Sequence, residues 1–66
     1  MDEQELKDLS DVIWQRKRQR LAQIRAAERA ERAGKKHLSW HLRCIIVDIN
    51  RQIASDERTY DQSLGF

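Results

Sequence analysis

The fold of this 66-residue chain is decided by residues 38–60, which read LSWHLRCIIVDINRQIASDERTY. Its apolar side chains recur every three or four residues, at Leu38, Leu42, Ile45, Ile46, Ile49, Ile53 and Tyr60. Side chains with this spacing share one face of an α-helix. Residues 44–47, CIIV, could instead form a strand, because β-branched residues favour sheets. The helical spacing continues on both sides of them, however, and no second strand is available, so we predict a helix over residues 36–62.

A second apolar stripe precedes this helix within residues 3–33. Its members are Leu6, Leu9, Ile13, Leu21, Ile24 and Ala27. Lys17 and Arg20 interrupt the stripe, although their aliphatic stems can cover apolar surface while the charge reaches water. Asp2 and Glu5 have the spacing of an N-terminal capping box, in which a side chain satisfies a free backbone N–H. We therefore predict a first helix over residues 3–33.

Glycine and proline divide the chain into these two helices. Proline is absent, and glycine occurs only at positions 34 and 65. Gly34 is placed to end the first helix in the left-handed conformation, which glycine adopts without steric cost. The turn spans residues 34–38 if Ser39 caps the second helix, and is shorter if that helix begins near residue 36. The predicted fold is all-α: a single domain over residues 1–66 that forms an antiparallel two-helix hairpin.

The apolar residues outnumber the positions that one hairpin can bury. We expect Leu38, Leu42, Ile45, Ile49 and Ile53 to form the core against Leu6, Leu9, Ile13, Leu21 and Ile24. Further apolar side chains lie off these faces: Val12, Trp14, Trp40, Cys44, Val47 and Ala54. So short a chain hides only about 60% of its extended surface on folding, and one cysteine excludes an internal disulfide. We predict a homodimer that forms a four-helix bundle; the alternative is a loosely folded monomer.

Charge is unevenly distributed along the chain. Residues 1–13 carry a net charge of −4, residues 14–36 one of +7, and residues 37–66 one of −1. Arg18, Arg25, Arg29 and Arg32 align on the first helix together with Trp14, and Arg16, Lys17 and Arg20 enlarge the cluster. Guanidinium groups bind phosphate with paired hydrogen bonds, so nucleic-acid binding is one interpretation. The other is that these charges complement the helix dipole or an acidic surface.

A set of potential metal ligands lies at the start of the second helix. His37, His41, Cys44 and Asp48 share one helix side, and each residue type binds zinc. One helix can offer only an adjacent pair of them to one ion, and the first helix supplies no histidine or cysteine. We expect ordinary polar residues here, with no metal, no cofactor and no catalytic site, because a hairpin lacks the pocket that a Cys–His pair would need.

The composition also limits the compartment and the partners. With 36% charged and 39% apolar residues, the chain is too polar for a membrane span. The acidic start predicts no secretory signal, and we expect a cytoplasmic protein.

We expect a small interaction or regulatory protein that binds a protein partner, with Trp14, Trp40, Val47 and Cys44 as interface candidates. The alternative is RNA or DNA binding through Arg16, Lys17, Arg18, Arg25, Arg29 and Arg32. In length and inferred architecture the chain is similar to the small helical-hairpin dimers that plasmids use to bind paired RNA loops, without a shared motif. Accessory regulators of phages and mobile elements have a similar architecture, and they commonly bind a host protein.

Overall fold

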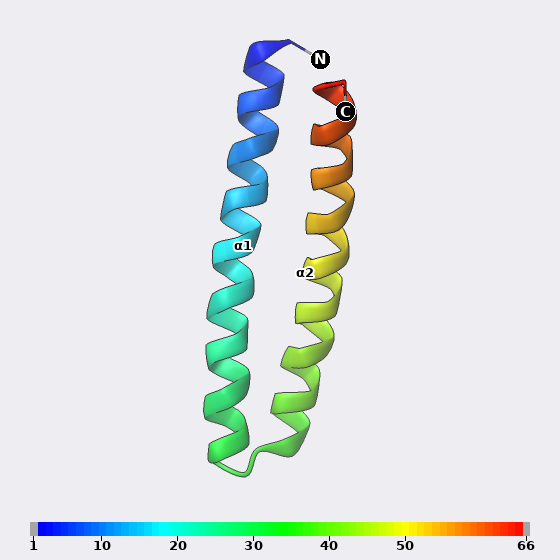
Figure 1. Ribbon diagram of the computed structural model, residues 1–66. Coiled ribbons are helices and arrows are strands. Elements are labelled where there is room, and N and C mark those ends of the chain that lie inside the picture. Colours follow the sequence, from blue (N-terminus) through cyan, green and yellow to red (C-terminus); the bar gives the residue numbers. More distant parts are fainter. Residues whose placement is uncertain (1, 66) are drawn as a thin grey trace.

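The computed structural model describes residues 2–65, which form two long helices lying side by side and antiparallel (Figure 1). Helix α1 spans Glu3–Arg32 and helix α2 spans Lys36–Ser63. The start of α1 and the end of α2 lie at the same end of the rod, which measures 48 × 15 × 13 Å. The described residues contain no strand, so the all-α hairpin and the helical interpretation of residues 44–47 are confirmed. Residues 1 and 66 of the predicted domain lie outside the described residues.

The first helix begins at the predicted cap. The Asp2 carboxylate accepts a hydrogen bond from the backbone N–H of Glu5 at 2.8 Å. Glu3 and Glu5 lie in the first turn, whereas Arg29 and Arg32 lie in the last. Acids at the N-terminus and bases at the C-terminus oppose the helix dipole, so part of the charge asymmetry stabilises α1 itself.

Gly34 ends α1 and reverses the chain. Its φ of 74° lies in the left-handed region, as expected. The backbone N–H of Lys35 donates to the carbonyl of Ala30 at 2.8 Å, and that of Gly34 donates to Glu31 at 3.1 Å. This pair of bonds forms a Schellman motif, which satisfies two carbonyls at the helix end. The chain therefore reverses within residues 33–35, between the two helices.

Ser39 lies inside α2 and is not its cap, since the helix begins at Lys36. Its backbone N–H donates to the carbonyl of Lys35 at 3.0 Å. The Ser39 side chain is buried, as are Ala27 and Ala30 on α1. These small side chains let the two backbones approach closely beside the short turn.

The contact between the helices, here called the seam, follows a strict alternation of three and four residues on both helices. On α1 the seam positions are Leu6, Leu9, Ile13, Arg16, Arg20, Gln23, Ala27 and Ala30. On α2 they are Ser39, Leu42, Ile46, Ile49, Ile53, Asp56, Tyr60 and Ser63. Every one of these residues is buried or half-buried. A repeat of 3.5 residues is the pattern of a coiled coil, in which the side chains of each helix fill the spaces between those of the other.

Two residues expected in the core are outside it. Leu21 is 48% exposed and Leu38 is 45% exposed. On α1, Arg20 and Gln23 occupy the seam positions on either side of Leu21. Polar side chains therefore lie in the seam where we expected a leucine. Ile13, Ala27, Ala30 and Ile53 are the buried apolar residues of the described chain, and so the monomer has a small core.

We expect Ile53→Ala to lower the free energy of unfolding by about 2–5 kcal/mol, because Ile53 is only 4% exposed. Leu21→Ala is the matched control and should change it by about 0.5 kcal/mol or less, since Leu21 lies outside the seam. Urea denaturation followed by circular dichroism measures both values. Equal losses for the two variants would contradict this assignment of the core.

Gly34→Ala should destabilise the hairpin by about 1–2 kcal/mol, the cost of a left-handed residue that carries a Cβ. The added Cβ would meet no atom within 4 Å, so the loss comes from the backbone alone. Gly34→Asn should lose less, because asparagine tolerates this conformation. The same denaturation measurement applies, and an alanine variant as stable as the wild type would be evidence against the observed turn.

Candidate functional site

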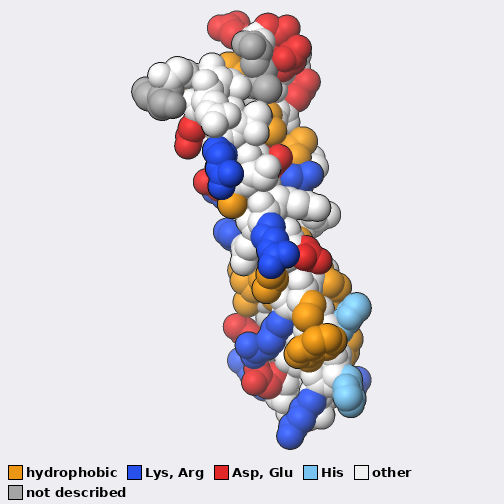
Figure 2. All heavy atoms as spheres, turned by 90° about the vertical axis from the view of Figure 1, so that its right-hand side faces the viewer, with side chains coloured by type: hydrophobic (Ala, Val, Ile, Leu, Met, Phe, Trp, Pro, Cys, Tyr) orange, Lys and Arg blue, Asp and Glu red, His pale blue; other side chains and the backbone are white. Residues whose placement is uncertain are grey.

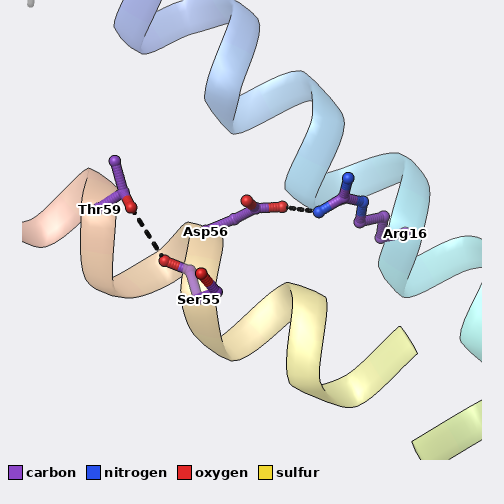
Figure 3. Close-up of polar contacts among 4 residues, drawn as sticks. All are labelled: Arg16, Ser55, Asp56 and Thr59. Atoms are coloured by element: carbon purple, nitrogen blue, oxygen red, sulfur yellow. Dashed lines mark hydrogen bonds and ion pairs between the residues drawn. The ribbon is translucent and has the colours of Figure 1, made fainter. Parts of the chain in front are cut away.

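Polar groups from both helices meet in the middle of the seam. Arg16 donates a hydrogen bond to the Asp56 carboxylate and forms an ion pair with it (Figure 3). Arg20 donates to the side-chain oxygen of Asn50 at 3.0 Å. Arg16 and Asp56 are both partly buried, with side chains 30% and 22% exposed. A pairing of this kind between seam positions favours one register, because sliding the helices would leave each charge without its partner.

One side of the seam is bordered by ion pairs, and we call it the ion-pair side. Lys17 Nζ lies 3.1 Å from Glu57 Oε1, and an Arg43 nitrogen lies 2.7 Å from Glu31 Oε2. Both pairs are largely exposed, so each contributes little to stability. Between them lies a groove of about 370 Å³, lined by Ile24, Ala27, Glu28, Arg43, Ile46 and Val47.

The opposite side of the seam has a different chemistry, and we call it the apolar side. A groove of about 460 Å³ lies there near the turn, lined by Ala26, Arg29, Ala30, Ala33, Lys35, Leu38 and Leu42. Within residues 2–65, the two exposed ion pairs lie on the ion-pair side, and the Arg16–Asp56 pair lies in the seam itself. Ala26, Ala30 and Ala33 were not expected to line a groove, although their spacing of four and three residues places them on one helix side.

The predicted basic cluster is divided by the structure. Arg16 and Lys17 are paired with Asp56 and Glu57 of α2. The other four candidates remain exposed on α1, and none of them forms an ion pair within residues 2–65: Arg18, Arg25, Arg29 and Arg32. Their spacing of three, four or seven residues keeps them on one helix side. They form a row about 20 Å long, at a rise of about 1.5 Å per residue.

The interface candidates are also divided. Trp40, Cys44 and Val47 follow one another along α2 at helical spacing and are all exposed. Trp40 is the most exposed large apolar side chain, at 68%, and Val47 is 47% exposed. Figure 2 shows hydrophobic side chains gathered over the half of the rod nearest the turn. Trp14 is 65% exposed but lies about 25 Å further along the rod, near the level of Asp56.

The potential metal ligands are scattered over an exposed surface. His37, His41, Cys44 and Asp48 are all exposed on α2. Within the described residues, no group of three or more His, Cys, Asp or Glu side chains lies close enough to hold an ion.

Acidic side chains gather at the end of the rod that holds the chain termini (Figure 2). In the part of the chain that the structure describes, neither helix has the length and apolarity that crossing a membrane requires. Comparison with known proteins finds no matching family model, no matching curated protein and no matching solved structure.

The Arg16–Asp56 pair yields a stability prediction. Asp56→Ala should lower the free energy of unfolding by about 1 kcal/mol, since Arg16 loses its partner in a half-buried position. Replacing both residues with leucine should match or exceed the wild type, because apolar side chains at seam positions avoid the cost of desolvating two charges. Thermal unfolding of the three proteins tests this. A double variant less stable than Asp56→Ala would show that the pair contributes more than its desolvation costs.

Proposed function

We propose that the protein is a non-catalytic interaction protein of the cytoplasm, a helical-hairpin dimer that binds a protein partner. The observation that carries this proposal is the exposure of large apolar side chains on the half of the hairpin nearest the turn. A monomer has little reason to expose neighbouring large apolar groups, and contiguous apolar surface marks interaction sites.

The ion-pair side near the turn is the proposed surface for the partner. Trp40 supplies a large aromatic side chain, the type that dominates binding energy at protein interfaces. Val47 is about half-exposed and lines the groove that contains Ile24. Leu21 is equally exposed and lies three residues before Ile24, on the same side of α1. The Glu31–Arg43 pair lies at its border. An apolar centre with a charged border is the usual anatomy of a protein interface.

A dimer is proposed because the hairpin buries so little by itself. Four apolar side chains are buried within the described residues, and none is fully buried. Small domains of this size commonly gain stability from a second copy, a metal or disulfides. Cys44 is free, which suits the reducing conditions of the cytoplasm.

Nucleic-acid binding is the second candidate, and the row of unpaired arginines on α1 favours it. Arg18, Arg25, Arg29 and Arg32 are exposed and form no ion pair within residues 2–65. A row of guanidinium groups on a rigid helix can contact successive phosphates, and the resulting affinity falls steeply with salt.

Capture from a lysate treated with nuclease, followed by titration of the purified partner, tests the leading proposal. We expect Trp40→Ala to weaken the affinity for the partner by at least about 30-fold, the effect of losing a binding hot spot. Trp14→Ala is the matched control, because it removes an equally exposed tryptophan elsewhere on the rod, and it should leave the affinity unchanged.

Nuclease treatment and charge-reversal variants distinguish nucleic-acid binding from protein binding. Nucleic-acid binding would be lost on nuclease treatment and in the variant Arg25→Glu/Arg29→Glu, but not in Arg51→Glu/Arg58→Glu. The latter makes the same charge change on exposed arginines of α2. Gel shifts at low and moderate salt measure this directly. Binding that survives nuclease and the Arg25/Arg29 reversal, but requires Trp40, would exclude nucleic acid as the partner on this surface.

A further inference from the structure

We propose that the apolar side of the seam is the dimer interface, occupied by a second copy of this chain with its turn at the opposite end of the bundle. This inference rests on the dimer of the proposed function and specifies its geometry. It also separates the surface used for self-association from the ion-pair side, where the protein partner is proposed to bind.

The middle of the apolar side carries no charged residue, although Arg29 and Lys35 line its groove near the turn. On α2, a line of residues starts at the groove and continues along the same helix side, each three or four residues from the next: Leu38, Leu42, Ile45, Ile49 and Gln52. On α1 the line is Gln19, Gln23, Ala26, Ala30 and Ala33. Neither line contains a charged residue, whereas the ion-pair side carries Lys17, Glu28, Glu31, Arg43 and Glu57.

An uncharged surface is what a two-fold interface requires. In such an interface the same surface meets itself, so a charge near the two-fold axis would face its own copy. Ile45 lies at the centre of the α2 line and is half-buried in the hairpin. A line of aliphatic residues with an aliphatic centre can pack against itself without leaving a charge desolvated. The ion-pair side is less suited to this, because Glu28 and Arg43 line its groove and two ion pairs border it. Arg29 and Lys35, which line the groove of the apolar side, lie off both uncharged lines.

One hairpin leaves a large surface exposed for a chain of this mass. The accessible surface is 5389 Å². A compact monomer of 7.9 kDa would expose about 4,400 Å². The excess is close to the roughly 800 Å² per partner that an interface of standard size covers. One more copy is therefore enough to cover it.

The distribution of charge along the rod favours one orientation of the two copies. Residues 14–36, which lead into the turn, carry a net charge of +7, whereas residues 1–13 carry −4. Two hairpins with their turns at the same end would bring like charges together. With turns at opposite ends, the basic half of each copy approaches the acidic end of the other, which is electrostatically favourable.

A two-fold axis through Ile45, the centre of the α2 line, would specify a register. If the two-fold axis passes through Ile45, Leu42 lies opposite Ile49 of the partner subunit, and Leu38 lies opposite Gln52 of the partner subunit. The turn, with Lys35 and Lys36, then lies beside the segment containing Asp56 of the partner subunit. Trp40 and Val47 point away from this contact and remain available to a protein partner.

The test compares two lysine substitutions by sedimentation equilibrium over a range of concentrations. We expect the wild type to sediment at twice the chain mass of 7.9 kDa. Ile45→Lys should raise the dissociation constant of the dimer by about 100-fold, since two lysines would meet near the axis. Val47→Lys places the same charge on the ion-pair side of the same helix, and it should leave the dimer intact.

Cross-linking provides a readout that does not depend on the stability of the lysine variants. In a Cys44→Ser background, Ile45→Cys should form a disulfide between copies on mild oxidation, because the two thiols would lie near the axis. Val47→Cys in the same background should not, because its thiol would face away from the partner. Circular dichroism confirms that each variant remains helical.

The outcomes distinguish a failure of the proposed interface from a failure of the proposed function. Dissociation by Ile45→Lys together with cross-linking at position 45 supports the proposed interface. A dimer that is disrupted or cross-linked only through position 47 overturns it, while leaving the dimeric interaction protein in place. A wild type that sediments as a monomer at tens of micromolar overturns both the interface and the proposed dimer. The Trp40 test of partner binding would stand independently.

Discussion

The alternation of three and four residues along the seam is the constraint on which the rest of the molecule depends. Because both helices keep this spacing, one side of each helix faces the other over the whole length of the rod. The spacing is kept even where the side chain is charged, as at Arg16, Arg20 and Asp56. The seam therefore has apolar side chains towards the termini, small side chains near the turn and polar side chains in between. The residues that occupy the seam determine which surfaces of the helices remain outside it.

The polar side chains in the middle of the seam specify the register of the two helices more than they stabilise the hairpin. The Arg16–Asp56 pair and the hydrogen bond from Arg20 to Asn50 are satisfied in one register of the helices. Polar groups in a helix contact commonly act in this way, at a cost in stability. This loss of stability matters here, because two of the four apolar residues that are buried within residues 2–65 are alanines. Association with a second copy is a physically reasonable way to recover it.

The two sides of the seam offer different surfaces for association. The apolar side is uncharged along its middle and is suited to meeting itself, whereas the ion-pair side combines Trp40 and Val47 with a charged border. A protein that must bind both itself and a partner needs two such separate surfaces. The row of exposed arginines on α1 is a third surface, of which Arg29 borders the apolar-side groove while Arg18, Arg25 and Arg32 do not line it.

The amino-acid sequence by itself determined the local structure: two helices, the Asp2 cap and the reversal at Gly34 follow from spacing and backbone chemistry. These features depend on neighbours along the chain, which a sequence displays directly. The tertiary structure decided which face of each helix forms the seam. It placed Leu21 and Leu38 outside the core, Ser39 inside it, and paired Arg16 and Lys17 with α2. The spacing of apolar residues could not predict which residues form the seam. A long cationic side chain can occupy a seam position when an acidic residue of the other helix lies opposite it. Which residues lie opposite each other is specified only when the two helices are packed together.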